Sequence, residues 1–232
     1  MEILKYYRSG AWSVTAKYDD SPVTQADLAS NEILVRGLER LNIARVVSEE
    51  GSQLPANSQE LFWLVDPLDG TKDFIAKRDT FVICMGLVSA GAPVFGLVHM
   101  PVTGETWWAQ AGQGAYGPKD QRLMHPKPHR PLIAAGSRSM DPARLKLKFP
   151  EHPIAEVRQM GSALKFCKLA QGEIDLYPRL GPTSEWDTCA GQVIAEEAGC
   201  VVLDLGTRAR LRYGKQNYVN SDGFLAARED LE

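Results

Sequence analysis

The sequence predicts a mixed α/β fold, with an α+β N-terminal half and an α/β C-terminal half. In the first half, apolar runs separated by glycine turns follow one another over residues 81–117, which is typical of an antiparallel sheet. In the second half, strand-like and helix-like segments alternate over residues 132–203, the order expected when helices cover a sheet. With 232 residues and 44% hydrophobic composition, the chain can bury a substantial core.

Two helices are predicted at the N-terminus. Residues 1–9 place apolar side chains on one face and end before Gly10. A clearer helix begins after Thr24 and runs to residue 41, with leucines at helical spacing. Thr24 is a good N-cap, and Asp27 can complete a capping box with it, which by itself explains the aspartate.

Two strands are predicted next, and each runs into acidic residues. A strand at residues 43–48 precedes Glu49, and a strand ending at Val65 precedes Asp66 and Asp69 on a Pro/Gly turn. Carboxylates crowded at the end of a buried strand are costly unless a cation offsets their charge. Oxygen donors without nearby Cys or His suit a hard cation, Mg²⁺ first and Mn²⁺ or Ca²⁺ next.

The turn after Asp69 can also bind an anion. Gly70 lets the backbone turn sharply and expose its N–H groups, and Thr71 adds a hydroxyl, so the segment can hold a phosphate as well as a metal ion. The structural alternatives are an Asx-type turn with two solvated aspartates and an ordinary acidic loop at Glu49. On the local pattern alone, both alternatives stay open.

A loop at residues 51–60 separates those two strands, and a long apolar stretch follows them. Residues 81–100 carry no Asp, Glu, Lys or Arg and are long enough to span a membrane. Gly91 and Pro93 interrupt the stretch in its middle. We therefore interpret its two parts as the strands of a buried hairpin.

Two further strands are predicted, at residues 105–109 and 112–117, before a proline-rich and basic linker at residues 119–131. We expect this linker to separate an α+β unit, residues 1–127, from an α/β unit, residues 128–232. The two units are expected to form one compact catalytic unit.

The second half alternates between strands and helices. Strands are predicted at residues 132–137, 154–160, 174–177 and 200–203, and helices at residues 141–147, 162–171 and 186–198. Ser162 is the predicted N-cap of the second of these helices. Asp187 lies three residues after another N-cap candidate, Ser184, where the helix dipole favours a carboxylate whatever its function.

Composition limits the kind of partner. A net charge of −3 and a pI near 5.9 are not those of a dedicated nucleic-acid binder, so we expect a small-molecule partner and no nucleic acid polymer. The cysteines, Cys84, Cys167, Cys189 and Cys200, form no Cys-x-x-Cys pair, which favours reduced thiols and a cytoplasmic location. The first residues contain charges throughout and no apolar signal segment.

Three ordered motifs carry a family resemblance: Glu49-Glu50, Asp66-Pro-Leu-Asp-Gly-Thr71 and Trp186-Asp-Thr-Cys-Ala-Gly191. The sequence resembles the lithium-sensitive, Mg²⁺-dependent phosphatase superfamily that includes inositol monophosphatases and fructose-1,6-bisphosphatases. Within it, residues 21–27, 48–50, 69–74, 161–167 and 175–187 are most similar to the CysQ-type 3′(2′),5′-bisphosphate nucleotidases. The resemblance implies the layered α/β/α/β/α sandwich of that family.

The resemblance also implies which residues hold the metals. Glu49, Asp66 and the backbone carbonyl of Leu68 would bind one Mg²⁺, and Asp66, Asp69 and Asp187 would bind a second. A third ion and replacement by Mn²⁺ are compatible with the family pattern. Li⁺ and Ca²⁺ are expected to inhibit.

Catalytic roles follow from the same resemblance. Thr71, hydrogen-bonded to Asp27, would orient the attacking water and help take its proton, and Glu49 is assigned to the same catalytic group. Two metal ions about 4 Å apart would clamp the phosphate oxygens and activate the water. The expected mechanism needs no covalent phosphoenzyme.

The resemblance places Ser137, with Gly136 beside it, Ser162, Lys165 and Arg179 on the nucleotide side. Other expected substrate contacts are Glu49, Leu68, Asp69, Gly70, Thr71 and Asp187. Arginine suits phosphate through its bidentate fork, and lysine supplies a point charge. On spacing alone, Lys165 would lie on a solvated helix face and Arg179 would form a loop salt bridge.

The expected activity is hydrolysis of the 3′-phosphate of 3′-phosphoadenosine 5′-phosphate to AMP and phosphate. Met140 departs from the nucleotidase pattern, which usually has His there, and a thioether cannot donate a hydrogen bond as imidazole does. The alternatives are an inositol-monophosphate or sugar-phosphate phosphatase with the same metal site, and a non-catalytic nucleotide or metal sensor. We expect a monomer or homodimer without a transmembrane segment, cytoplasmic or peripheral on the cytoplasmic side of the inner membrane.

Overall fold

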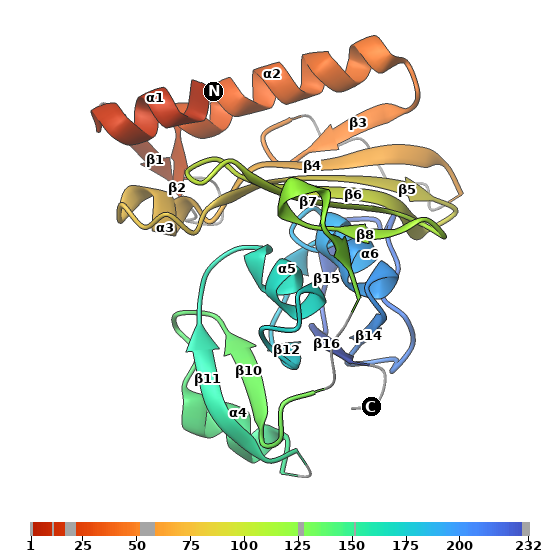
Figure 1. Cartoon of the computed structure of the whole chain (residues 1–232). Coiled ribbons are helices and arrows are strands. Elements are labelled where there is room, and N and C mark those ends of the chain that lie inside the picture. The colour runs from red at the N-terminus through yellow and green to blue at the C-terminus, as the bar shows by residue number, and fades with distance from the viewer. Residues whose placement is uncertain are drawn as a thin grey trace.

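The fold stacks helices and sheets alternately in the computed structural model, which describes residues 2–10, 12–16, 22–51, 59–124, 128–150 and 152–228 (Figure 1). The N-terminal helices cover one face of a seven-stranded sheet, a second helix pair lies between that sheet and a five-stranded sheet, and a short helix covers the outer face of the latter. The order α/β/α/β/α is confirmed. The helical segments are α1 (Glu2–Ser9), α2 (Gln25–Leu41), α3 (Thr71–Ile75), the 3₁₀ turn η1 (Pro118–Asp120), α4 (Pro142–Lys148), α5 (Leu164–Ala170) and α6 (Cys189–Glu197).

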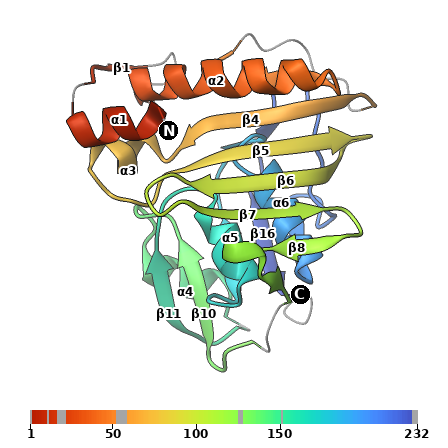
Figure 2. The ribbon, with the colours of Figure 1, turned by 45° about the horizontal axis from the view of Figure 1, so that its top comes forward.

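The seven-stranded sheet has the order β3-β4-β5-β6-β7-β8-β9, and Figure 2 shows β4 to β8 side by side in that order. Its strands are β3 (Arg45–Ser48), β4 (Leu61–Asp69), β5 (Val82–Ser89), β6 (Ala92–Met100), β7 (Glu105–Gln110), β8 (Gly114–Tyr116) and β9 (Arg122–Leu123). The β3–β4 pair is parallel and the other pairs are antiparallel. The antiparallel sheet predicted for the first half is therefore correct.

The five-stranded sheet has the order β11-β10-β12-β16-β14. Its strands are β10 (Leu132–Gly136), β11 (Ile154–Gln159), β12 (Leu176–Arg179), β14 (Cys200–Asp204) and β16 (Phe224–Arg228). Two small antiparallel pairs are separate from both large sheets: β1 (Val14–Ala16) with β2 (Pro22–Thr24), and β13 (Thr183–Ser184) with β15 (Val219–Asn220). Strand β16, which was not predicted, pairs antiparallel with both β12 and β14. The alternating second half thus folds into a mixed sheet.

Local sequence signals explain the best-predicted elements. The Thr24 side chain accepts a hydrogen bond from Ala26 N while Asp27 accepts one from Thr24 N, so the capping box that begins α2 is confirmed. Ala90 and Gly91 both have positive φ, as a tight β-hairpin turn requires, and the predicted β5–β6 hairpin is confirmed. Among the described residues, no helix is long and apolar enough to cross a membrane.

The strand predicted to end at Val65 continues to Asp69, so the expected turn at Asp66 is wrong. The register against β5 shifts between Asp66 and Asp69, which leaves one extra residue on β4. Such a bulge bends a strand without ending it, and bulges are common beside active sites. Here the bulge lets a Pro-containing acidic segment remain inside the sheet.

Several predicted boundaries are also wrong. Helix α5 begins at Leu164 with Ala163 as its N-cap residue, so Ser162, at a left-handed φ of 57°, lies one residue before the cap although its Oγ accepts from Leu164 N at 3.3 Å. Helix α6 begins at Cys189 instead of residue 186, because the chain first makes a turn around Asp187. The predicted linker contains η1 and β9, and its residues 125–127 lie outside the described residues, as does most of the predicted loop at 51–60.

Helix α6 packs directly on the seven-stranded sheet because that sheet has glycines beneath it. A Cβ at Gly86 would overlap Cys189, and a Cβ at Gly96 would overlap the carbonyl oxygen of Ala190. The four cysteines, all in the described residues, are buried free thiols. The large core between the two sheets is therefore tightly packed and without disulfides.

Replacing Gly96 with alanine is expected to lower the free energy of unfolding by about 2 kcal/mol, because the contacted atom belongs to the backbone of α6 and cannot rotate away. Urea unfolding measures the change. Gly37→Ala is the matched control, since nothing lies within 4 Å of a Cβ there. That exposed helical position should instead gain roughly 0.5 kcal/mol. Equal stability of the two variants would contradict this account of the packing.

Candidate active site

The four acidic residues that were predicted to bind metal ions lie close enough together for their charges to interact. Glu49 follows β3, Asp66 and Asp69 lie in β4, and Asp187 precedes α6. Burial raises the pKa of Asp66 well above its ordinary value, and the charges of Glu49, Asp69 and Asp187 raise it further. Burial also raises the pKa of Asp187, with Asp69 and Glu49 adding to the effect.

Backbone N–H groups hold three of these carboxylates in place. Asp66 Oδ1 accepts from Leu68 N at 2.9 Å, within the bulge of β4. Asp187 Oδ2 accepts from Ser184 N at 3.1 Å, but Ser184 lies in β13 and α6 begins only at Cys189, so the predicted helix-capping role of Asp187 is wrong. Asp69 Oδ2 accepts from Ala163 N, at the start of α5. The cluster is thus built from both halves of the chain.

The donor set fits a hard divalent cation. Asp66 is only 2% exposed, yet its nearest charged neighbours are carboxylates that oppose its ionisation. Oxygen donors of this kind suit Mg²⁺, which would offset their mutual repulsion. Within the described part of the chain, no three His, Cys, Asp or Glu side chains surround one point closely enough to hold a metal ion as they stand. The ligand assignments therefore stay predictions.

Asp27 and Thr71 lie together beside the cluster. Thr71 Oγ1 donates to Asp27 Oδ1 at 3.2 Å and lies 3.3 Å from the carbonyl oxygen of Leu68. Asp27 Oδ2 meanwhile accepts from Thr24 N at 2.8 Å. The two oxygens of Asp27 serve different purposes, so its capping role and its contact with Thr71 hold together.

A cavity of about 150 Å³ adjoins the cluster. Most of the predicted nucleotide-side residues line it together with two of the acidic residues: Asp69, Ser137, Ser162, Lys165, Arg179 and Asp187. Gly136 lies one residue before Ser137 at the end of β10 and is not among the lining residues. Residues from both halves of the chain therefore meet at one cavity.

Lys165 does not lie on a solvated helix face. It is 5% exposed, donates to Ser162 O at 2.6 Å and lies 5.0 Å from the ring centre of Tyr177. Burial lowers the pKa of Lys165 to about 8, an effect that Asp69 partly opposes. A buried cation facing the acidic cluster is suited to an anionic ligand that enters this cavity.

Arg179 does not form the loop salt bridge expected from spacing alone. Its NH2 group donates to Pro182 O at 3.1 Å, and its buried Nε has no hydrogen-bond partner within the described residues. An unsatisfied buried donor is costly unless a ligand accepts from it. This orientation therefore fits a phosphate in the cavity.

Ser162 and Met140 differ from expectation. The Ser162 hydroxyl donates to Thr80 O at 2.7 Å, so its hydrogen is directed to the protein. Met140 packs against the outer core beneath α4 and does not line the cavity. The usual histidine contact thus has no replacement at Met140.

Sequence reasoning did not assign Asp73, Tyr177 or Thr183 to the site. Tyr177 and Thr183 line the cavity and belong to a stretch that already carried the family resemblance, which was the available signal. Asp73 is 3% exposed and accepts from Arg138 Nε at 2.8 Å and from Thr80 Oγ1 at 2.7 Å. Asp73 thereby links α3 to the loop that carries Ser137, and no local sequence pattern predicts that contact.

Without divalent cations, the protein is expected to be less stable at pH 8 than at pH 5. The pKa of Asp69 is raised from 3.8 to about 6 in the folded state, and those of Asp66 and Asp187 are raised well above their ordinary values. Protonation of these three carboxyl groups therefore stabilises the folded protein fully below their unfolded-state pKa values. That stabilisation is lost as the pH rises through their folded-state pKa values and the carboxyl groups ionise. In EDTA, calorimetry should show a Tm lower by roughly 5 °C at pH 8.

Mg²⁺ should restore most of that loss at pH 8, because a bound cation replaces the protons. The Asp66→Asn variant is the control, since removing one charge should flatten the pH dependence measured in EDTA. An unchanged slope in that variant would contradict the electrostatic account.

The fold and the acidic cavity are those of a known family of phosphatases. The model of the inositol monophosphatase family matches residues 1–231. The chain belongs to the inositol monophosphatase family, a family of Mg²⁺-dependent phosphatases. The resemblance inferred from the motifs is thereby confirmed.

Within this family, the chain is similar to proteins named CysQ. The 3′(2′),5′-bisphosphate nucleotidase CysQ of Escherichia coli K12 is 38% identical over 203 residues, which cover 82% of this chain and 79% of that protein. The Buchnera aphidicola CysQ is 33% identical over 236 residues, covering 97% of this chain and 88% of that protein. The crystal structure of CysQ from Bacteroides thetaiotaomicron has a TM-score of 0.82 at 31% identity, covering 98% of this chain and 92% of that one.

Proposed function

We propose that this protein hydrolyses the 3′-phosphate of 3′-phosphoadenosine 5′-phosphate to AMP and phosphate. The observation that carries the proposal is the single cavity in which Asp69 and Asp187 face Lys165 and Arg179. Acidic residues for metal ions and cationic residues for a second phosphate are both needed by a bisphosphorylated substrate. The likeness to proteins named as bisphosphate nucleotidases supports the same choice.

The proposed metal ligands are Glu49, Asp66, the carbonyl of Leu68, Asp69 and Asp187. Bound Mg²⁺ would polarise the phosphate and make a water nucleophilic at neutral pH. The residues supply a fixed arrangement of anionic oxygens, three of them anchored by backbone N–H groups. Two or three ions, support by Mn²⁺ and inhibition by Li⁺ or Ca²⁺ belong to this proposal.

Thr71 and Asp27 are proposed to orient the attacking water and accept its proton. The Thr71 hydroxyl donates to Asp27 Oδ1, so its oxygen lone pairs stay free to accept from a water. Asp27 is 1% exposed and held by Thr24, which fixes the direction of its carboxylate. Gly70, with φ of 99°, turns the backbone between Asp69 and Thr71.

Arg179 and Lys165 are proposed to bind the phosphate that is not hydrolysed, with Ser137 beside them. The buried Nε of Arg179 supplies an unused donor for a phosphate oxygen. Lys165, in α5, adds a second positive charge to the cavity that Arg179, in β12, also lines. A monophosphate substrate would leave these cations without their anion. We further propose a cytoplasmic monomer or homodimer.

Phosphate release should be compared across 3′-phosphoadenosine 5′-phosphate, adenosine 3′-monophosphate, inositol 1-phosphate and fructose 1,6-bisphosphate. The bisphosphate nucleotide should give the highest kcat/KM. Arg179→Gln should raise the KM for the bisphosphate nucleotide about 10-fold, because one charged hydrogen bond to its second phosphate is lost. The KM for adenosine 3′-monophosphate, which lacks that phosphate, should change little. Faster turnover of inositol 1-phosphate would establish the neighbouring phosphatase function, and binding without hydrolysis would establish a sensor.

A further inference from the structure

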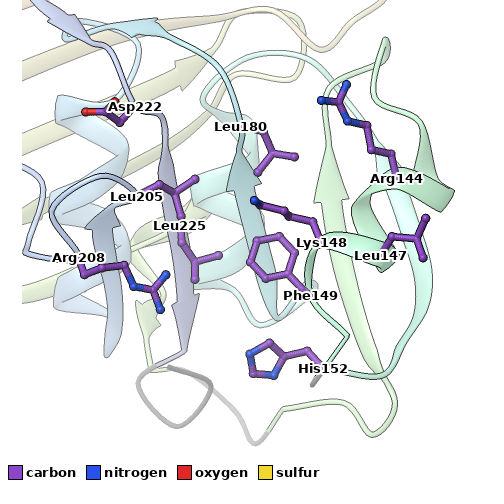
Figure 3. Close-up of a pocket in the computed structure, with 10 residues that line it drawn as sticks. All are labelled: Arg144, Leu147, Lys148, Phe149, His152, Leu180, Leu205, Arg208, Asp222 and Leu225. Carbon is purple, nitrogen blue, oxygen red and sulfur yellow. The ribbon is translucent and has the colours of Figure 1, made fainter.

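A second and larger cavity, of about 700 Å³, lies on the outer side of the five-stranded sheet (Figure 3). It is bounded by α4, by the segment after β12, by the turn after β14 and by the start of β16. It shares no lining residue with the active-site cavity. Its size is within the range of small-molecule sites.

The floor of this cavity is apolar and recessed. Leu225 is 3% exposed and Phe149 is 7% exposed, and both belong to the core beneath α4. Leu180 and Leu205 pack against the same core and complete the floor. Water over such a surface gains little from the protein, so an apolar ligand body would displace it favourably.

The rim is cationic. Figure 3 shows Lys148, from the end of α4, and Arg208, from the turn after β14, extending toward the floor from opposite sides. Arg144 lies one turn earlier on α4. Within the described residues, none of these three side chains makes a hydrogen bond or an ion pair. Asp222 is the lining carboxylate, and Figure 3 shows it turned away from Lys148.

We propose that this cavity binds a soluble organic anion: an alkyl or aryl body on the leucine and phenylalanine floor, with one carboxylate or phosphate between Lys148 and Arg208. Lys148 and Arg208 are both exposed cations on the rim of the cavity, so an anion bound between them would interact with both, and the apolar side chains of the floor suit an apolar body. A membrane surface fits less well, because the floor is recessed and Leu147 is the lining apolar residue that protrudes, at 81% exposure.

Calorimetric titration of the protein with decanoate tests the proposal, with decanol and inorganic phosphate as matched probes. Decanoate should bind with one site per chain and a Kd below roughly 1 mM, and each matched probe should bind at least about 10-fold more weakly. Lys148→Gln and Arg208→Gln should each weaken decanoate about 10-fold. Lys146→Gln, on the same helix but outside the cavity lining, should leave the Kd unchanged.

Unchanged phosphate release in all three variants will show that they fold. Equal binding of decanol would remove the role of the cations, and equal binding of phosphate would remove the role of the floor. Equal weakening by Lys146→Gln, or absence of saturable decanoate binding, would overturn the site. Binding of phosphatidylglycerol vesicles without binding of decanoate would assign the surface to a membrane and likewise overturn it.

Discussion

Replacing Asp69 with asparagine is expected to reduce phosphate release about 10³-fold while leaving the fold intact. Asparagine keeps the shape and an oxygen that can accept from Ala163 N, but it removes one negative charge from the cluster. That charge is proposed to hold a metal ion beside the reacting phosphate, where preorganised electrostatic groups contribute about 10²–10³ in rate each. The loss should therefore appear mainly in kcat and in the Mg²⁺ concentration needed for activity.

Stopped assays of phosphate release across a Mg²⁺ series measure both quantities. Asp120→Asn is the control, because it removes the same charge from an exposed turn outside the active-site cavity. Direct titration of Mg²⁺ by calorimetry gives a readout independent of turnover. Unchanged Mg²⁺ affinity and unchanged activity in Asp69→Asn would refute the assignment of the acidic cluster.

Thr71→Val should lower kcat by about 10²–10⁴-fold, the usual contribution of a positioned proton acceptor. Valine matches threonine in shape but cannot bridge a water to Asp27, which now lies 3.2 Å from the hydroxyl. Thr71→Ser keeps the hydroxyl and should retain most of the activity. The measurement is kcat and KM for the bisphosphate nucleotide, and KM should change little.

Combining Thr71→Val with Asp27→Asn tests whether the two residues act as one unit. If they share one proton-transfer function, the double variant should be no slower than the slower single variant. Asparagine preserves the acceptor for Thr24 N, so the cap of α2 should survive and thermal stability should change little. Multiplicative losses in the double variant would show that the residues act separately.

The sequence predicted the elements whose signals are local. The capping box at Thr24 and Asp27 and the hairpin turn at Gly91 are each encoded within a few residues, and the structure has them. The family motifs then indicated which acidic residues belong together. Periodicity alone left each aspartate with a sufficient structural explanation.

The remaining features depend on contacts between distant segments. Strand β16 is an inner strand because it pairs with both β12 and β14, and its short apolar sequence contains no sign of that position. The burial of Lys165 follows from the packing of α5 under the acidic cluster, which helix spacing cannot reveal. The bulge at Asp66 likewise depends on the register with β5.

The glycines beneath α6 have a consequence for how this enzyme tolerates change. Because Gly86 and Gly96 carry no side chain, Cys189 and Ala190 of the helix lie directly against the sheet backbone and leave no room for a Cβ. Asp187 immediately precedes that helix, so a repacking mutation that lifts α6 carries the carboxylate outward with it. If Asp187 binds a metal ion as proposed, interior variants with unchanged unfolding can therefore still lose turnover.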